Sequence, residues 1–328
     1  MTPELQSPAT GSPPSRTSAP PLSAPGAISV RGLSQRFGDK VALHPLDLDL
    51  EAGGVTGLLG PNGSGKSTLM RLLVGLIPLG EGEVHVDGLR LTGDGLAIRR
   101  RTTYAPGELH LYGEMKGAEH LRFLLRGRDR ATVQRATATA ESLGLPLNKR
   151  VRGYSHGMKR QLCFAAAMAP DVRIRILDEI SEGLDPAKRS EVLDAIEADA
   201  ARGTTVLLSS HHLGEVDRSC ERLLFINEGK LIADESAASV SERAARLVRL
   251  TYADAAQLGE IEAAIEGAGV ESIRRDDTSL HVLLDSNDPR ALLGRLASRG
   301  DLPAPMALEH GKLSLRELYR SLYGVEGT

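Results

Sequence analysis

The sequence predicts an α/β core with parallel strands and a helical insertion, followed by a small α+β domain. Three observations support this prediction. First, a glycine-rich stretch, 60–68, joins an apolar run to a helical pattern. Second, apolar runs at 173–177 and 205–208 flank another helical pattern. Third, short strand and helix patterns resume after about residue 239. Strands that alternate with helices in this way are typical of parallel sheets.

Composition divides the chain into three segments. Residues 1–27 are dominated by Pro, Ser, Ala, Thr and Gly, so they bury too little apolar surface to offset the entropy of ordering, and we expect a disordered tail. Residues 28–238 are expected to form the core, and residues 239–328 an accessory domain. Two domains fit a chain of 328 residues.

Charge and cysteine content exclude several classes of protein. The net charge of −3 provides no positive field for nucleic acid, so we expect no nucleic-acid partner. Cys163 and Cys220 stand far apart without a Cys/His cluster, which favours buried free thiols over a metal site or a disulfide. No apolar run approaches the roughly 20 residues that span a bilayer, and the N-terminus lacks a secretory signal. We therefore expect a soluble, cytoplasmic protein.

The core elements follow in order along the chain. Residues 28–30, the alternating run 46–50 and residues 84–86 predict strands, the last in an edge hairpin with Asp87-Gly88. Residues 116–169 are mostly helical in pattern and interrupt the strands. Strands are then predicted at 173–177, 205–208 and 222–227, the first two parallel and joined by a helix over 188–201.

Residues 60–68, GPNGSGKST, carry the clearest chemistry. Between a strand and a helix, such glycines turn backbone N–H groups inward to form an anion nest at the helix N-terminus. Lys66 can then reach the β- and γ-phosphates of a nucleotide, and the Ser67 hydroxyl can ligate Mg²⁺. A chance match in a glycine-rich chain is the alternative, and the flanking strand and helix argue against it. The predicted nucleotide-binding residues are Gly60, Pro61, Asn62, Gly63, Ser64, Gly65, Lys66, Ser67 and Thr68.

Two carboxylates, Asp178 and Glu179, end the apolar strand at 173–177. Ligands of open α/β sheets bind at the carboxyl ends of the strands. Asp178 is therefore predicted to hold Mg²⁺ with Ser67, and Glu179 to polarise the water that attacks the γ-phosphate. By itself, an apolar run ending in Asp-Glu indicates only a solvated strand end, and the phosphate loop is what favours the functional interpretation.

Further segments resemble the ATP-binding subunits of ABC transporters. Residues 154–161, YSHGMKRQ, resemble the signature segment of that family. Residues 183–186, GLDP, resemble its D-loop, and residues 209–211, SSH, its switch-histidine loop. Phe37 occupies the place of the aromatic that stacks on adenine, although it could also be a plain core aromatic. The resemblance covers about 28–235 and implies a P-loop NTPase core of the ABC-ATPase type.

The resemblance also implies a function. Such a chain hydrolyses ATP with Mg²⁺, closes as a homodimer over two composite sites, and powers a separate transmembrane permease at the inner face of the cell membrane. The trailing C-terminal domain resembles the export branch that handles drugs, lipids or ions. Two alternatives remain open: a soluble ABC-type ATPase acting on ribosomes or DNA, and a non-hydrolysing nucleotide switch. The implied residues are Glu179 and His211 for catalysis, Asp185 in the D-loop, and Ser155, His156, Gly157 and Met158 acting in trans.

The chain departs from the family pattern after Tyr104-Ala105-Pro106, where Gly107 replaces the usual glutamine. We hypothesise that Glu108 takes over as a Mg²⁺ ligand, because a hard cation accepts carboxylate oxygen readily. The alternative is that this loop only senses the membrane partner.

Other departures are smaller. His156 replaces a glycine of the signature and Ile180 replaces a proline, and both are interpreted as tolerated variation. Arg173 and Arg175 interrupt a strand that should be nearly all apolar, so we expect their shared face to reach solvent or an acidic partner.

The C-terminal domain is predicted from its alternating elements. Strand patterns occur at 247–252, near 273, at 281–284 and at 306–308, and helical patterns at 258–268 and 289–298. This βαββαβ order predicts a small ferredoxin-like domain, closed by a helix at 315–322.

Overall fold

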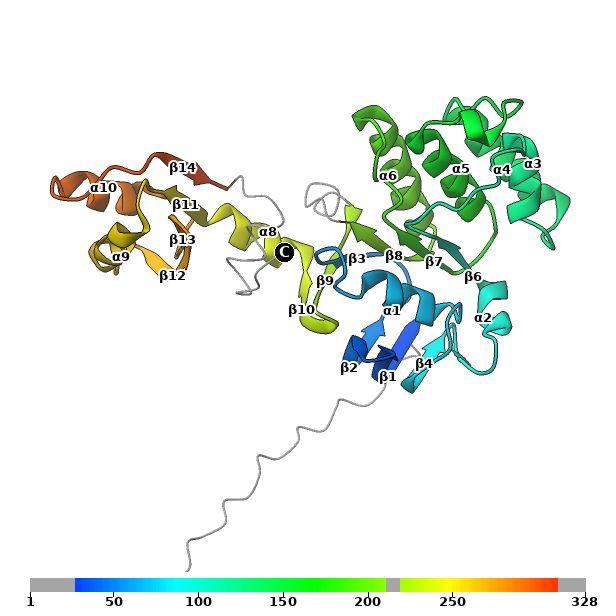
Figure 1. Ribbon diagram of the computed structural model, residues 1–328, viewed down its shortest axis with the longest axis horizontal. Helices are drawn as coiled ribbons and strands as arrows, with labels where there is room; N and C mark the ends of the chain where they lie inside the picture. The colour runs from blue at the N-terminus through cyan, green and yellow to red at the C-terminus, as the bar shows by residue number, and fades with distance from the viewer. Residues whose placement is uncertain (1–26, 211–218, 312–328) are drawn as a thin grey trace, which may run out of the picture.

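The structure, a computed structural model, describes residues 27–210 and 219–311 (Figure 1). Residues 1–26 of the tail predicted over 1–27, the residue His211 and the predicted helix at 315–322 lie outside these residues. None of the helices within the described ranges has the length and apolar character needed to cross a bilayer.

A six-stranded sheet of order β10-β9-β3-β8-β7-β6 forms the centre of the core. The contacts among β9, β3, β8, β7 and β6 are all parallel, and β10 is an antiparallel edge strand. All residues of β3, β7 and β8 are buried, which explains why these strands appear as nearly continuous apolar runs in the sequence. The strands span Val55–Leu59 (β3), Thr102–Ala105 (β6), Ile174–Asp178 (β7), Thr205–Ser210 (β8), Arg222–Asn227 (β9) and Lys230–Ser236 (β10).

Helices cover both faces of this sheet. Leu69, Met70 and Leu73 of α1 (Lys66–Leu73) pack into one apolar cluster with β3, β7 and β9, and Val192 and Ile196 of α6 (Pro186–Ala200) pack into another on the opposite face. Burial of these apolar side chains on both faces is the main stabilising contribution to the core. Ligands of open α/β sheets bind at the carboxyl ends of the strands, which is where a site is expected in this core.

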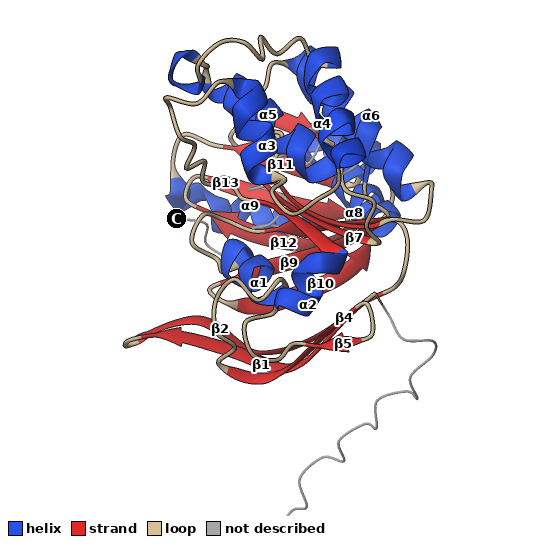
Figure 2. Ribbon diagram, turned by 90° about the vertical axis from the view of Figure 1, so that its right-hand side faces the viewer, coloured by secondary structure: helices blue, strands red, loops and turns tan. Residues whose placement is uncertain are grey.

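A second sheet, of order β2-β1-β4-β5, is antiparallel and packs across α1. Figure 2 shows this sheet below α1 and the central sheet. The predicted hairpin after residue 86 is confirmed, because Asp87 and Gly88 both adopt a positive φ between β4 and β5. The strands span Ile28–Phe37 (β1), Lys40–Leu50 (β2), Glu81–Val86 (β4) and Leu89–Arg90 (β5).

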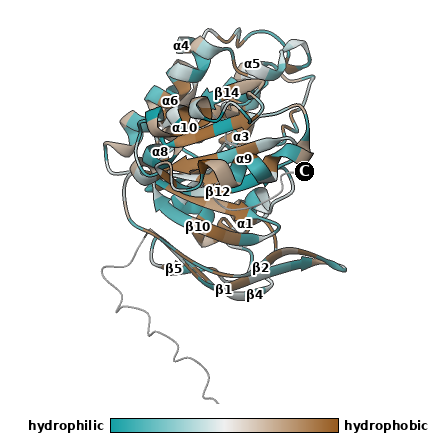
Figure 3. Ribbon diagram, turned by 90° about the vertical axis from the view of Figure 1, so that its left-hand side faces the viewer, coloured by the Kyte–Doolittle hydropathy of each residue, from teal (hydrophilic) through white to brown (hydrophobic). Residues whose placement is uncertain are grey.

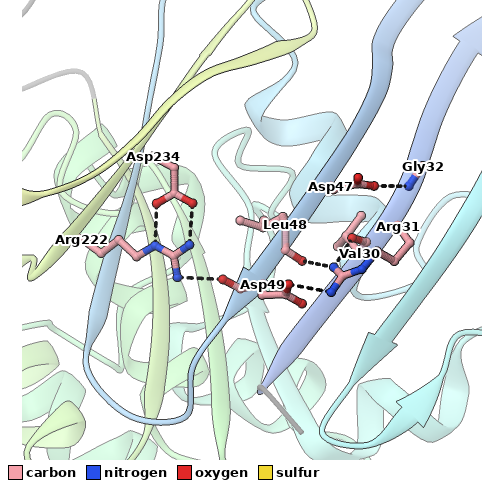
Figure 4. Close-up of polar contacts among 8 residues, drawn as sticks. All are labelled: Val30, Arg31, Gly32, Asp47, Leu48, Asp49, Arg222 and Asp234. Atoms are coloured by element: carbon pink, nitrogen blue, oxygen red, sulfur yellow. Dashed lines mark hydrogen bonds and ion pairs between the residues drawn. The ribbon is translucent and has the colours of Figure 1, made fainter. Parts of the chain in front are cut away.

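An arginine network joins the two sheets (Figure 4). Arg222 on β9 pairs with both carboxylate oxygens of Asp234 on β10, at 2.6 and 2.5 Å. Its third nitrogen donates to the Asp49 carbonyl on β2 at 2.7 Å. The Asp49 carboxylate in turn binds Arg31 on β1 at 2.6 Å. The bidentate pair lies within the central sheet and fixes the direction of the guanidinium, and the third nitrogen makes the contact to the antiparallel sheet.

The helical insertion has an apolar core of its own, built from residues such as Leu121, Ala136, Val151 and Leu162. The helical pattern predicted for 116–169 is confirmed by α3 (Gly117–Leu124), α4 (Arg130–Ser142) and α5 (His156–Met168). A short helix, α2 (Leu96–Arg101), precedes β6.

The expectation for Arg175 is wrong. Its side chain is buried inside the core, where it pairs with Asp199 of α6 and donates to the carbonyls of Ala167 at 2.7 Å and Pro170 at 2.9 Å. A buried guanidinium is tolerated because these acceptors replace its water. Arg173 instead precedes β7, and its side chain is 84% exposed, 3.5 Å from Asp87.

The C-terminal unit follows α8 (Ala237–Ala245) and has the βαββαβ order that the sequence predicts. Its antiparallel sheet has the order β12-β13-β11-β14. Val248, Leu250, Leu280 and Val282 lie in one apolar cluster with residues of α9 and α10. Figure 3 shows apolar strands among more hydrophilic helices on this side of the molecule. The elements span Leu247–Thr251 (β11), Leu258–Ile265 (α9), Val270–Asp276 (β12), Ser279–Leu284 (β13), Arg290–Ser298 (α10) and Ala307–His310 (β14).

Candidate active site

The loop between β3 and α1 can be made only with glycine at two positions. A Cβ at Gly60 would lie 2.1 Å from the Ile226 carbonyl oxygen, and one at Gly65 would lie 2.9 Å from the Ala42 carbonyl oxygen. Gly65 also has φ of 108°, which side chains disfavour. The backbone therefore turns tightly under β2 and β9 and directs the N-terminus of α1 at the carboxyl end of the sheet.

Lys66, the first residue of α1, is a buried cation with only partial compensation. Its Nζ donates to the carbonyls of Gly60 at 2.7 Å and Pro61 at 3.1 Å, and it lies 4.0 Å from Glu179 Oε1. Burial lowers the pKa of Lys66, while Glu179 and Asp178 act in the opposite direction. The buried Ser64 hydroxyl has no hydrogen-bond partner among the described residues. An unpartnered donor and a buried amine at a helix N-terminus fit an anionic phosphate.

Asp178 and Glu179 lie opposite this loop, at the end of β7. Asp178 is fully buried, and it accepts from the Ser209 hydroxyl at 2.7 Å and from the Tyr104 hydroxyl at 3.4 Å. The Glu179 N–H donates to the same Ser209 oxygen at 2.8 Å, and Glu179 has φ of 48°. Burial raises the pKa of Glu179, and the charge of Lys66 opposes that rise.

The carboxylates fit a divalent cation that brings other oxygen ligands with it. Within the described residues Asp178 has two hydroxyl partners and no ion pair, so its buried charge calls for a cation. No group of three or more His, Cys, Asp or Glu side chains in that part of the chain could form a complete metal cage. Mg²⁺ is commonly held by one or two protein ligands together with substrate phosphates.

The loop after β6 brings Gly107, and not Glu108, to these carboxylates. A Cβ at Gly107 would lie 3.3 Å from Asp178 Oδ2 and 3.6 Å from Glu179 Oε2. The Glu108 carboxylate is 76% exposed and lies 3.9 Å from the Arg71 guanidinium. The structure thus places this loop beside Asp178 and Glu179, whereas the carboxylate of Glu108 lies beside the half-buried Arg71.

The signature segment and the D-loop contact each other within one chain. Ser155 caps α5 by accepting from the Met158 N–H at 3.2 Å. A Cβ at Gly157 would lie 2.9 Å from the Gly183 carbonyl oxygen, and one at Gly183 would lie 2.8 Å from the His156 ring. Asp185 caps α6 by accepting from the Lys188 N–H at 3.0 Å. The exposed N-terminus of α5 is thus held in place by the D-loop.

Arg160 is a site residue that sequence reasoning missed. It is almost completely buried, and it donates to the carbonyls of Pro106 at 3.2 Å and Gly107 at 2.5 Å. Its other terminal nitrogen pairs with Glu182 at 3.2 Å. The feature of the sequence that could have indicated this role is an arginine on the inward face of α5, one turn after His156. This side chain joins the signature helix to the Gly107 loop and to the segment after Glu179.

Known proteins resemble this chain over most of its length. The ABC transporter family matches residues 43–182. A daunorubicin/doxorubicin resistance ATP-binding protein from Streptomyces peucetius is 32% identical over 306 residues, which cover 91% of this chain and 92% of the relative. The chain belongs to the ABC transporter ATP-binding family. A daunorubicin resistance ATP-binding protein from Streptomyces coeruleorubidus is 36% identical over 74% of this chain and 79% of its own length.

Solved structures of ABC ATP-binding proteins share the fold. One, described as the ATP-binding subunit of an ABC transporter, matches with a TM-score of 0.60 and 27% identity over 65% of this chain and 91% of its own. A dimeric ATP-binding cassette bound to ADP and Pi matches with a TM-score of 0.58 and 23% identity over 64% of this chain and 98% of its own. The predicted P-loop NTPase core with its helical insertion is confirmed.

Two further features of this ABC protein are the end of β1 and a groove beside the Gly107 loop. Phe37 ends β1 and is 51% exposed, on the hairpin whose other strand contacts Gly65 through Ala42. A groove of about 670 Å³ opens beside the Gly107 loop, between the core and the helical insertion. It is lined by residues that include Arg71, Tyr104, Glu108, Leu111, Leu124 and Cys163.

Proposed function

We propose that this chain is the ATP-hydrolysing subunit of a membrane exporter. The observation that carries the proposal is that Lys66 Nζ lies 4.0 Å from Glu179 Oε1, with the charge of Asp178 also acting on Lys66. A buried amine, a carboxylate of raised pKa and an acidic metal ligand are the groups that phosphoryl transfer to water needs. Relatives named for daunorubicin resistance and for Nod factor export in Rhizobium leguminosarum support an export role with an organic cargo.

The residues take the following roles in this proposal. The backbone of residues 60–65 and Lys66 bind the phosphates, and Phe37 stacks on adenine. Ser67 and Asp178 would hold Mg²⁺, which neutralises charge on the phosphate oxygens when bound. Glu179 accepts a hydrogen bond from the attacking water and orients it. His211 contributes a second contact to that water and the γ-phosphate.

Glu108 has two possible roles, and the geometry favours one. To act as a metal ligand it would have to leave Arg71 and reach past Gly107. Its position on the rim of the groove instead favours the role of sensing a partner.

Two copies form the working unit in this proposal. The exposed N-terminus of α5, with Ser155, His156, Gly157 and Met158, would bind the γ-phosphate held by the other copy. The D-loop with Asp185 lies against the same helix end and would face the partner as well. A separate permease would dock in the groove beside Glu108 and hold the pair at the inner face of the cell membrane.

Replacement of the proposed catalytic base tests this function. We expect Glu179→Gln to lower the ATPase rate by at least about 100-fold, because it removes a base but keeps the shape of the site. The same protein should form a stable dimer with Mg-ATP, measured by light scattering after size exclusion. Glu191→Gln, a carboxylate paired with Lys188 on the surface of α6, is the control and should keep both properties of the wild type.

The other outcomes separate the alternatives. Nucleotide binding without turnover in the wild type would support a nucleotide switch. An ATPase rate that is unchanged in Glu179→Gln would instead refute Glu179 as the base. A strictly monomeric Glu179→Gln protein with Mg-ATP, with and without membranes, would refute the two-copy mechanism. Purification from membranes with identification of an associated permease tests the transport role, whereas co-purification with ribosomes or DNA would support the soluble alternative.

A further inference from the structure

The Gly107 loop leaves Asp178 without the polar side chain that its position offers. The hypothetical Cβ at Gly107 points at Asp178 Oδ2 from 3.3 Å, so any side chain there would contact the carboxylate directly. Glycine provides no side-chain donor. The other oxygen, Oδ1, is already fixed by Ser209 at 2.7 Å. A second donor is therefore needed to fix the plane of the carboxylate.

Tyr104 supplies that donor from β6, the strand that ends just before the loop. Its hydroxyl donates to Asp178 Oδ2 at 3.4 Å, on the side where Gly107 has no side chain. A tyrosine hydroxyl carries a proton and can donate it to a carboxylate. Tyr104 and Asp178 come from the neighbouring parallel strands β6 and β7, which fixes their spacing.

Arg71 holds the tyrosine in this direction. Its guanidinium, on α1, lies close enough to the Tyr104 hydroxyl to interact with it, and because a guanidinium can only donate, it attracts the hydroxyl oxygen and not its proton. The Glu108 carboxylate lies 3.9 Å from the same guanidinium. Arg71, Tyr104 and Glu108 all line the groove, so this row of contacts runs from the groove to the buried carboxylate.

We propose that Tyr104, oriented by Arg71, is the positioning residue for Asp178 in this chain and performs the task for which Gly107 lacks a side chain. This inference rests on the proposed function, in which Asp178 holds Mg²⁺. A carboxylate with both oxygens fixed presents its remaining lone pairs to the cation at one angle. Loss of the tyrosine hydroxyl frees one oxygen and weakens the binding of the metal-nucleotide complex, but not the binding of the nucleotide alone.

The test measures the affinity of a fluorescent ATP analogue with Mg²⁺ and with EDTA. We expect Tyr104→Phe to bind the analogue in EDTA as tightly as the wild type does. The Mg²⁺ gain, defined as the ratio of the affinity with Mg²⁺ to the affinity in EDTA, should be about tenfold smaller than in the wild type. Tyr112→Phe removes an exposed hydroxyl from the same loop region and is the matched control. An equal loss with and without Mg²⁺ would mark Tyr104 as structural and overturn the proposal, as would an unchanged Mg²⁺ gain.

A double-mutant cycle tests the part played by Arg71. We expect Arg71→Met to reduce the Mg²⁺ gain by about threefold, and Arg71→Met with Tyr104→Phe to be no worse than Tyr104→Phe alone, because the arginine acts through the hydroxyl. Losses of the two single variants that add in the double variant would show that Arg71 does not act through the Tyr104 hydroxyl.

The result also separates this inference from the proposed function. A wild type that hydrolyses ATP, together with a Tyr104→Phe protein of unchanged Mg²⁺ gain, would refute only the positioning role. A wild type that binds no nucleotide would refute the proposed function itself.

Discussion

The Ser209 hydroxyl donates to Asp178 Oδ1 at 2.7 Å from the adjacent strand. The Ser209 hydroxyl oxygen also accepts a hydrogen bond from the N–H of Glu179 at 2.8 Å. One side chain therefore fixes both the proposed metal ligand and the backbone of the proposed base. Asp178 and Ser209 are both buried, where a hydrogen bond is costly to lose.

Removal of this hydroxyl should therefore impair turnover more than folding. We expect Ser209→Ala to lower kcat by about tenfold, since a hydrogen bond to a charged group is lost and Glu179 is less well oriented. Thr205→Val removes the hydroxyl at the other end of the same strand, which accepts from Gly53, and should leave kcat close to that of the wild type. Steady-state kinetics at saturating Mg-ATP distinguish the two; equal effects would contradict a specific role for Ser209.

Phe37 should contribute to nucleotide affinity and not to the chemical step. Because it is half exposed at the end of β1, its truncation leaves no large cavity. We expect Phe37→Ala to raise KM for ATP by about tenfold at unchanged kcat, the pattern of lost uniform binding, because base stacking on an aromatic ring is removed. Phe37→Tyr should retain the wild-type KM, and Phe123→Ala, another exposed aromatic, is the control. An unchanged KM for Phe37→Ala would show that its ring does not contact the base.

Glu108→Ala distinguishes the two roles considered for this glutamate. Since its carboxylate lies on Arg71 and is largely exposed, we expect the ATPase rate without a permease to stay within about threefold of the wild type. A loss of tenfold or more, rescued by higher Mg²⁺ concentration, would instead show that Glu108 ligates the metal.

Arg175 should contribute strongly to stability at neutral pH. Burial by itself would raise the pKa of Asp199, but its hydrogen bonds to Arg175 and Arg202 lower it below the ordinary value of 3.8. The pair thus stabilises the fold above that pH, and this contribution is lost as pH falls through the lowered pKa. We expect Arg175→Met to lower the free energy of unfolding by about 3 kcal/mol at pH 7, because it leaves Asp199 buried with less compensation.

The pH dependence of that loss provides the check. In Arg175→Met the pKa of Asp199 should rise, so the difference from the wild type should shrink between pH 7 and pH 4 in urea unfolding. Arg173→Met, at an 84% exposed side chain, should change stability by less than about 0.5 kcal/mol. A pH-independent loss in Arg175→Met would indicate a packing defect and not an electrostatic one.

These residues also show what a sequence can and cannot predict. Residues 60–68 and the βαββαβ order were predictable because glycine spacing and apolar periodicity are local properties. Arg175 was misinterpreted because its partners, Asp199 and the carbonyls near the end of α5, reach it only through packing. The direction of the Glu108 side chain was missed for the same reason, since Arg71 is distant in sequence.

The buried position of Arg160 constrains how the helical insertion can rotate. Its guanidinium ties α5 to the carbonyls of Pro106 and Gly107 and to Glu182. A swivel of the insertion against the sheet must either drag this loop along or break three contacts at once. Hinge points consequently belong outside the tied residues, and engineered crosslinks meant to freeze the swivel should be placed across those flanking segments.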